Sequence, residues 1–155
     1  MRDKISSFQL SLPDAELLFD LAQQAGQSGW SLKQWQEELS HPQSHIWGVN
    51  DSATSSLIGF LAVRYDAAEF WIMNLAVAPS YRRSGIAAQL MSELVERADM
   101  SQANIWLEVR SGNQAAIQLY AQFGFEVSSI RKGYYAAREG LSKEDATLMC
   151  RSFNL

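Results

Sequence analysis

The residues from Val77 to Ala87 have the composition of an anion-binding turn. Two arginines, Arg82 and Arg83, stand next to Gly85, and a segment with helical spacing begins directly after them. The first turn of a helix presents unpaired N–H groups and about half a positive charge, so it attracts anions. Two cations and a residue without a side chain at that turn would hold a diphosphate. The alternative is that Gly85 only eases packing and that both arginines are solvated.

Other reactive side chains argue against several kinds of site. Cys150 is the only cysteine, which excludes an internal disulfide and a zinc cluster with two or more cysteines. His41 and His45 are four residues apart, but Pro42 interrupts the helix that would bring them to one face. The sequence contains no Walker loop, no Gly-x-Gly-x-x-Gly pattern and no Gly-x-Ser-x-Gly turn. We therefore expect no metal site, no dinucleotide fold and no covalent acyl-enzyme.

Length and composition indicate one ordinary globular domain. The chain has 155 residues, of which 47% are hydrophobic and 19% charged, and we take residues 1–155 as a single domain. The longest apolar run, Ile58 to Val63, is far shorter than the roughly 20 residues that cross a bilayer. The first residues, Met1 to Lys4, lead into polar residues and not into an apolar signal core. These features predict a cytoplasmic protein without a membrane partner.

The charge balance bears on the kind of partner. Thirteen Lys and Arg residues against 17 Asp and Glu residues give a net charge of −4. A protein that binds a phosphate backbone usually has a strongly basic face, so we expect no nucleic-acid partner. A cationic peptide is the better candidate. The sequence does not indicate an oligomeric state.

Hydrophobic periodicity and turn residues divide the chain into short elements. The expected elements are a strand from Ile5 to Gln9, a helix that opens at Ser11 to Asp14 and ends near Gly26, a helix from Ser31 to about Ser40, strands from His45 to Asn50, Leu57 to Tyr65 and Glu69 to Val77, a helix from Ser84 to Ala98, a strand from Asn104 to Val109, a helix from Asn113 to Gly124, and strands from Glu126 to Tyr135 and Ala146 to Phe153. This order predicts a mixed sheet with helices on both faces.

Two of these elements have specific local signatures. Ser31 and Gln34 are spaced as a capping box, and Trp30 and Trp35 occupy the positions of a hydrophobic staple. The strand from Glu69 to Val77 is apolar almost throughout, as a strand covered on both faces would be, so we expect it at the centre of the sheet.

The turn and its surroundings resemble the acetyl-CoA core of the Gcn5-related N-acetyltransferases (GNAT). The resemblance is carried by four segments: Asn74 to Val77, Arg82 to Ala87, Trp106 to Arg110, and Asn113 to Phe125. It runs from about Glu69 to Tyr135, with a weaker likeness at Trp30-Ser31. Within the family the sequence is most similar to the RimI type, which acetylates the N-terminal alanine of a small-subunit ribosomal protein. The resemblance implies an α/β protein of mixed α+β character, with a mostly antiparallel sheet of six or seven strands and about four helices.

The resemblance also implies a binding site for acetyl-CoA as co-substrate. The backbone of Leu75, Ala76 and Val77 would pair with the pantetheine arm, which lies like an added strand. The amides from Arg83 to Ala87 would take the pyrophosphate. The residues implied as cofactor contacts are Leu75, Ala76, Val77, Arg82, Arg83, Ser84, Gly85, Ile86, Ala87, Asn113 and Tyr120. Ala87 replaces the second glycine of the family motif, so we expect a weaker or slightly shifted phosphate contact.

The resemblance implies Glu108 as general base and Tyr120 as general acid. An α-amino group, with a pKa of about 7.7 to 8.0, is partly neutral at pH 7, so a modest base acting through water suffices for an N-terminal substrate. A tyrosine hydroxyl with its usual pKa of about 10 can protonate the departing CoA thiolate. Without the family motif, Glu108 would be interpreted as a solvated charge or the partner of an arginine such as Arg110, and Tyr120 as a core aromatic.

The acceptor side is less specific. Trp30, Tyr134 and Tyr135 are the candidate substrate-binding residues, because the resemblance implies a peptide groove between their two segments. Both tyrosines could instead be amphipathic residues of an edge strand. The expected acceptor is a protein or peptide with a free N-terminus, such as a basic ribosomal protein. Two alternatives are an acetyltransferase for lysine side chains or small amines, and a noncatalytic acyl-CoA-binding module.

Overall fold

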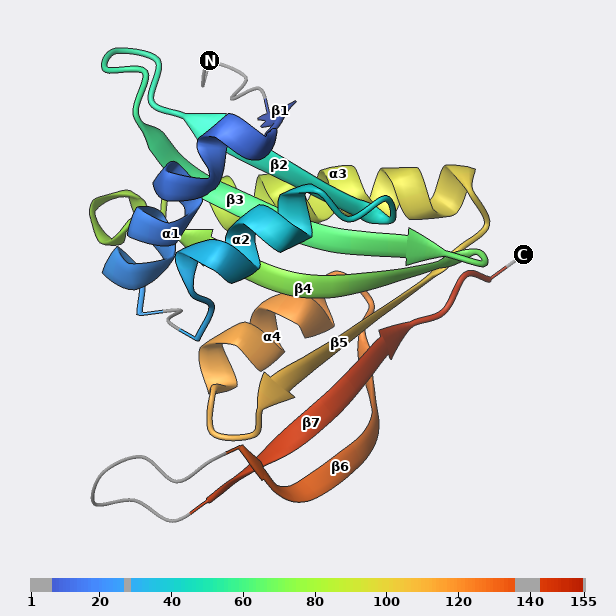
Figure 1. The fold of residues 1–155 in the computed structure, drawn as a ribbon. Helices are drawn as coiled ribbons and strands as arrows, with labels where there is room; N and C mark the ends of the chain where they lie inside the picture. The colour runs from blue at the N-terminus through green and yellow to red at the C-terminus, as the bar shows by residue number, and fades with distance from the viewer. Residues whose placement is uncertain (1–6, 27–28, 136–142, 155) are drawn as a thin grey trace.

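A computed structural model describes residues 7–26, 29–135 and 143–154 of the chain. The described strands form one seven-stranded sheet in the order β1-β2-β3-β4-β5-β7-β6, as Figure 1 shows. Residues Met1 to Lys4 and Ile5, which carry the sequence predictions of a polar start and of the beginning of the first strand, lie outside the described residues. The order of elements and the mixed sheet agree with the sequence prediction.

The strands are β1 (Ser7–Gln9), β2 (Ser44–Asn50), β3 (Leu57–Asp66), β4 (Glu69–Val77), β5 (Asn104–Arg110), β6 (Glu126–Tyr135) and β7 (Glu144–Arg151). The helices are α1 (Ala15–Gln24), α2 (Leu32–Leu39), α3 (Ile86–Met100) and α4 (Gln114–Gln122), with short 3-10 turns η1 (Leu12–Asp14) and η2 (Pro79–Tyr81). All neighbouring strands are antiparallel except β4 and β5, which are parallel.

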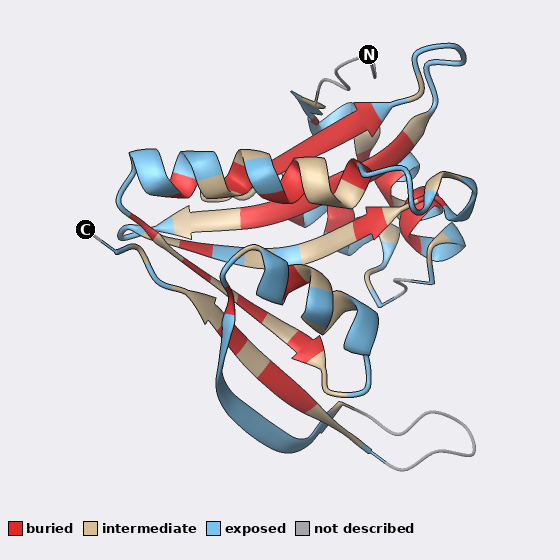
Figure 2. Cartoon of the chain, turned by 180° about the vertical axis from the view of Figure 1, so that it is seen from behind, coloured by how far each residue is buried: buried red, intermediate tan, exposed pale blue. Residues whose placement is uncertain are grey.

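The helices lie on both faces of the sheet. Figures 1 and 2 show α1 and α2 on one face and α3 and α4 on the other. On the first face Trp35 of α2 packs edge-on against Phe60 of β3, and both side chains are fully buried. On the second face Leu90 and Leu94 of α3 belong to the same core. No helix within the described ranges is long and apolar enough to cross a membrane.

Local signals in the sequence predicted the helix ends well. The Ser31–Gln34 capping box starts α2, and the rings of Trp30 and Trp35 lie 4.6 Å apart, as a hydrophobic staple requires. The last strand differs from its prediction, because β7 ends at Arg151 and not at Phe153. Beyond Arg151 the N–H of Phe153 donates to the Asn104 side chain at 2.9 Å instead of continuing the strand ladder.

The prediction for β4 is correct in its position and wrong in its burial. β4 is the fourth of the seven strands, but Trp71 and Met73 are 38% and 36% exposed. Apolar side chains there indicated two covered faces. At Trp71 and Met73 the cover is incomplete, and the Trp71 ring stacks on Trp106 with 5.6 Å between the ring centroids.

Candidate active site

The sheet opens between its two parallel strands. Among the described residues, β4 and β5 pair only over a short length, where Glu69–Trp71 of β4 lies beside Asn104–Trp106 of β5. Beyond this short contact β4 is paired with β3, while β5 is paired with β7, and Figure 1 shows the two strands separating. The register shift at Met73 adds one residue to β4 where the strands separate. The side of β4 that faces the opening has no strand partner among the described residues, so an extended chain could pair there.

The turn between β4 and α3 lies at the open end of β4. Gly85 is the N-cap of α3 with φ +85°, and Arg83 has φ +64°. A Cβ atom built on Gly85 would meet nothing within 4 Å. The glycine is therefore required by its left-handed backbone and not by close packing, which argues against the packing interpretation. Arg83, Ser84 and Gly85 are exposed, so their amides face solvent at the positive end of the helix dipole.

Several hydrogen bonds that the sequence did not reveal hold this turn. Arg82 donates from Nη2 to the carbonyl of Ala25 at 3.1 Å, just after α1. Ser84 Oγ donates to the carbonyl of Tyr81, and the Tyr81 hydroxyl donates to Asp51 in the β2–β3 loop. This last bond lowers the pKa of Asp51 and raises that of Tyr81. The turn is thus fixed to two other segments; Arg82 and Arg83 are both exposed, and Arg82 is the one bonded to the end of α1.

A glycine that the sequence prediction did not single out places the helix start. A Cβ atom on Gly59 of β3 would come within 2.8 Å of Ile86 Cγ2 in the first turn of α3. Only a residue without a side chain lets the helix approach β3 this closely. Ala87 follows with its backbone inside the helix, where alanine is favoured.

These positions fit an extended nucleotide thioester with a diphosphate. Leu75, Ala76 and Val77 lie on the length of β4 that borders the opening, and the exposed amides of the turn follow within ten residues of chain. A strand edge suits an amide-containing arm, and a helix N-terminus beside Arg83 suits phosphate oxygens. The donor set of this chain therefore matches the group that the sequence predicted.

A second group of predicted residues lies across the opening, on β5, α4 and β6. Burial, followed by the charge of Tyr135, raises the pKa of Tyr120 to about 12. Burial, followed by the charge of Glu108, raises the pKa of Tyr135. Tyr135 thus acts electrostatically on Tyr120, and Glu108 acts on Tyr135, which links the three residues in one group. Tyr120 is only 8% exposed and packs on Phe125, so it is a core aromatic as well as a member of this group.

Two arginines, Arg131 and Arg110, contact this group. Arg131 Nη1 lies 3.6 Å from Glu108 Oε1, so Glu108 does have an arginine partner, which is Arg131 and not the Arg110 given as an example. Arg110 instead lies over the Tyr135 ring at 4.2 Å and 3.7 Å from Glu144. Alternation along β5 could have shown that Glu108 and Arg110 share a face of the sheet. The contact between Glu108 and Arg131 could not be found in this way, because it depends on the long-range pairing that places β6.

The remaining predicted residues have distinct surroundings. Asn113 is the N-cap of α4, where its Oδ1 accepts from the N–H of Ala116 at 3.2 Å, which leaves its Nδ2 as a donor. Tyr134 and Tyr135 pack edge to face at 5.2 Å on the edge strand β6, and Tyr134 is 51% exposed. Among the described residues, Trp30 packs on Trp35 at the start of α2 and not on either of the two tyrosines. The residues that the structure describes contain no cluster of three or more His, Cys, Asp or Glu side chains suited to a metal ion.

Comparison with known families gives a match over most of this architecture. Residues 15–125 match the family described as acetyltransferase (GNAT) family. The match covers the opening between β4 and β5, the β4–α3 turn and α4, and it ends before β6 and β7.

Similar proteins with assigned names extend the likeness to the ends of the sheet. The chain is 30% identical over 141 residues to the ribosomal protein bS18-alanine N-acetyltransferase of Escherichia coli K12, covering 90% of this chain and 92% of that protein. It is also 30% identical over 132 residues to the N-alpha-acetyltransferase RimI of Mycobacterium tuberculosis, covering 81% of each chain. The crystal structure of the Escherichia coli ribosomal-protein-S18-alanine N-acetyltransferase superposes with a TM-score of 0.87 at 26% identity, covering 97% of this chain and 94% of that chain.

Proposed function

Because this chain belongs to the acetyltransferase (GNAT) family, we propose that it acetylates the free α-amino group of a peptide or protein with acetyl-CoA as donor. The observation that carries the proposal is the opening between β4 and β5, with the exposed α3 N-terminus at one end and the Glu108–Tyr135–Tyr120 group on its other side. Acetyl-CoA supplies an activated acetyl group as a thioester. Residues 1–155 act as one domain in this proposal.

Glu108 is proposed as the general base, through water or directly. Its carboxylate attracts the protonated amine and takes the proton that the amine must lose before it attacks. An α-amino group needs little help, because its pKa of about 7.7 to 8.0 leaves part of it neutral at pH 7. A lysine side chain, with a pKa of about 10.4, would need a much stronger base. This difference favours an N-terminal acceptor over a lysine acceptor.

Tyr120 is proposed as the group that assists departure of the CoA sulfur. A thiol has a pKa of about 8.5, whereas the pKa of the Tyr120 phenol is raised to about 12. Full proton transfer from this phenol to a thiolate would therefore run uphill. The hydroxyl instead stabilises the sulfur by donating a hydrogen bond, and solvent completes the protonation.

The finer acceptor assignment is an alanine-first, basic ribosomal protein in the cytoplasm. Two features support it: the Escherichia coli relative is named for the alanine of ribosomal protein bS18, and the net charge of −4 suits a basic partner. Trp30, Tyr134 and Tyr135 are proposed as acceptor-binding residues. The second candidate, a small-amine acetyltransferase, would use the same acetyl-CoA site.

An assay with three acceptors tests the proposal. Purified protein and acetyl-CoA are incubated with an alanine-first basic peptide, with the same peptide N-terminally blocked but containing lysine, and with a polyamine. We expect release of CoA thiol and a mass increase of one acetyl group for the first peptide only. Glu108→Gln should lower kcat about 100-fold, as expected for loss of a general base, with an unchanged Kd for acetyl-CoA.

Each other outcome would assign this protein a different function. Product from the blocked peptide or the polyamine alone would replace the N-terminal assignment by the corresponding amine. Tight acetyl-CoA binding without product from any acceptor would favour a noncatalytic acyl-CoA-binding module. Full turnover by Glu108→Gln would remove this residue as the base.

A further inference from the structure

A polar pocket of about 350 Å³ lies beside α2, on the sheet face that α1 and α2 cover. It is lined by Trp30, Gln34, Glu37, Glu38, His41 and Arg64. Apart from Trp30, none of these residues belongs to the predicted acetyl-CoA or acceptor site. The pocket therefore needs its own explanation.

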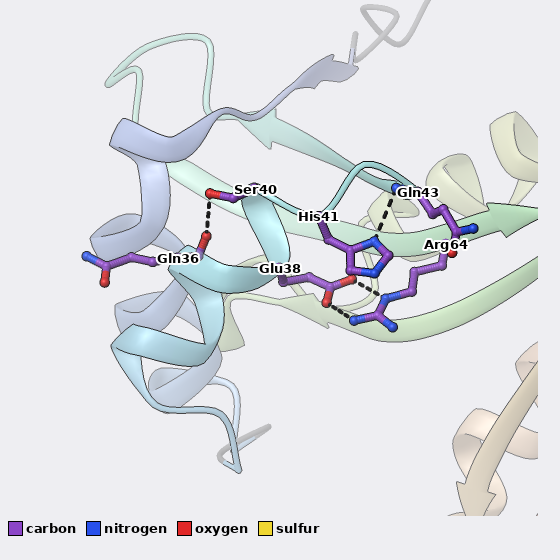
Figure 3. Close-up of polar contacts among 6 residues, drawn as sticks. All are labelled: Gln36, Glu38, Ser40, His41, Gln43 and Arg64. Carbon is purple, nitrogen blue, oxygen red and sulfur yellow. Dashed lines mark hydrogen bonds and ion pairs between the residues drawn. The ribbon is translucent and has the colours of Figure 1, made fainter.

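The wall of this pocket contains an ion pair between a buried carboxylate and a partly exposed guanidinium. Figure 3 shows Arg64 of β3 donating from Nε and Nη2 to the two carboxylate oxygens of Glu38, at 2.9 and 2.6 Å. Glu38 is 4% exposed; burial alone would raise its pKa, but the hydrogen bonds and the charge of Arg64 lower it overall. Because the Arg64 side chain is partly exposed, solvent screens the pair, and its contribution to the stability of the fold is small. Its clear effect is to hold the guanidinium in one orientation.

The Arg64 guanidinium, oriented by Glu38, has one donor nitrogen left for another partner. Both bonds to Glu38 leave Nη1 of Arg64 unused within the described residues, and Figure 3 shows this nitrogen on the side away from the carboxylate. Because Glu38 already cancels its charge, the guanidinium suits a neutral carbonyl oxygen better than an anion. Glu37, at the same pocket, has only an exposed and distant partner in Lys33 at 4.0 Å. The pocket thus favours a peptide carbonyl next to a cationic side chain.

Strand register connects Arg64 with the proposed base across one face of the sheet. Arg64 pairs with Trp71, Trp71 pairs with Trp106, and Glu108 follows two residues later on the same side of β5. Two strand spacings of about 4.8 Å and two residues of about 3.3 Å place the Cα atoms of Arg64 and Glu108 at least about 12 Å apart, since β5 separates from β4 beyond Trp106. Three or four residues of extended peptide span that distance.

We propose that Arg64, oriented by Glu38, binds a main-chain carbonyl at the third or fourth residue of the acceptor peptide. Glu37 lies beside a basic side chain at that point. The exposed ring of Trp71, stacked on the partly buried Trp106, lies under the peptide between this subsite and Glu108. Arg64 is a specificity residue in this arrangement, and Glu38 positions it. The inference rests on the proposed N-terminal acetylation.

The test compares a short and a long acceptor. The wild type is assayed with an alanine-first dipeptide amide and with an alanine-first hexapeptide that has lysine at its third and fourth residues. We expect kcat/KM to be at least tenfold higher for the hexapeptide, and Arg64→Lys to lower this ratio about tenfold, because lysine keeps the charge but loses the fork. The double variant Glu38→Leu/Arg64→Met should lower the ratio equally.

Matched variants separate the subsite from general damage. Glu37→Gln should lower kcat/KM for the lysine-containing hexapeptide but not for its glutamine analogue, whereas Glu96→Gln, exposed on α3, should change neither. An unchanged ratio in folded Arg64→Lys, or an equal loss on both acceptors, would overturn the subsite. If wild-type protein acetylates the dipeptide and the hexapeptide equally, the subsite fails and N-terminal acetylation stands. If it acetylates neither, the proposed function itself fails.

Discussion

Burial is the main reason why the Tyr120 hydroxyl holds its proton firmly. The side chain is 8% exposed, and the charge of Tyr135 adds to the effect, which together raise its pKa to about 12. The phenol therefore remains a neutral hydrogen-bond donor over the whole range in which an α-amino group changes from cation to nucleophile. At this residue, packing and chemistry depend on the same burial.

The raised pKa makes stability depend on Tyr120 at high pH. A tyrosine in the unfolded chain ionises near pH 10 and the folded one near 12, so the folded state binds the proton more tightly. Its contribution is complete below pH 10 and is lost as the pH rises from about 10 to 12, by about 1.4 kcal/mol per pH unit. Tyr120→Phe should therefore lose less free energy of unfolding over this interval, as measured by urea denaturation at pH 9, 10 and 11. Tyr134→Phe is the exposed control, and identical slopes in all three proteins would contradict the assignment.

At the level of residues, sequence patterns identified candidates but not their partners. The family motif singled out Glu108 and Tyr120, and both lie in one group with Tyr135. The sequence could not predict that Arg131 pairs with Glu108, because that contact depends on β6 returning beside β7. The Glu38–Arg64 pair had no motif at all, and its residues lie 26 positions apart.

The turn that starts α3 depends on the backbone of one glycine. Gly85 has φ +85° and open space around its missing side chain, so alanine there would strain the backbone without a steric clash. Gly26, after α1, has φ +73° and equally open space. The chain thus offers two glycines with the same conformational requirement in different surroundings.

We expect Gly85→Ala and Gly26→Ala to lose similar stability, about 1 to 2 kcal/mol each, because each forces an alanine into the left-handed region. Only Gly85→Ala should also weaken acetyl-CoA binding, by roughly tenfold, since its amide belongs to the proposed phosphate site. Thermal denaturation measures the first effect and calorimetric titration the second. Equal acetyl-CoA affinities in the two variants would place the phosphates elsewhere.

At the level of elements, the predictions succeeded where short-range signals decide. The capping box of α2 and the Asn113 cap of α4 are local hydrogen bonds, so spacing alone revealed them. The burial of β4 was misjudged because its apolar side chains do not reveal how completely other elements cover its two faces: Trp71 pairs with Trp106 of β5 and is still 38% exposed. The role of Gly59 was not predicted either, because glycine is needed there to make room for Ile86, which is distant in the chain.

For the whole molecule, the excess of acidic residues should affect how fast basic acceptors bind. A net charge of −4 attracts cationic peptides over a distance that salt shortens, from about 30 Å at 0.01 M to about 8 Å at 0.15 M ionic strength. We expect kcat/KM for a lysine-containing peptide to fall several-fold between these conditions and to change little for a glutamine analogue. Steady-state kinetics at both salt concentrations measure this difference. The same slope for both peptides would mean that salt acts on the enzyme and not on the encounter.

The overall architecture was the most predictable level. The order of strands and helices followed from periodicity, and the family likeness rested on segments that occupy one region of the fold. Which strands keep exposed residues was not predictable, because it depends on how the helices distribute over a sheet of seven strands.

The short contact between β4 and β5 divides the sheet into two ladders. Strands β1 to β4 form one and β5 to β7 the other, and among the described residues only three register pairs join them directly. A bound molecule that pairs with the free edge of β4 and also contacts β5 or α4 would connect the two groups of strands. Occupancy would then couple the ladders mechanically, so a saturated protein should melt as one cooperative unit at a higher temperature than the empty one.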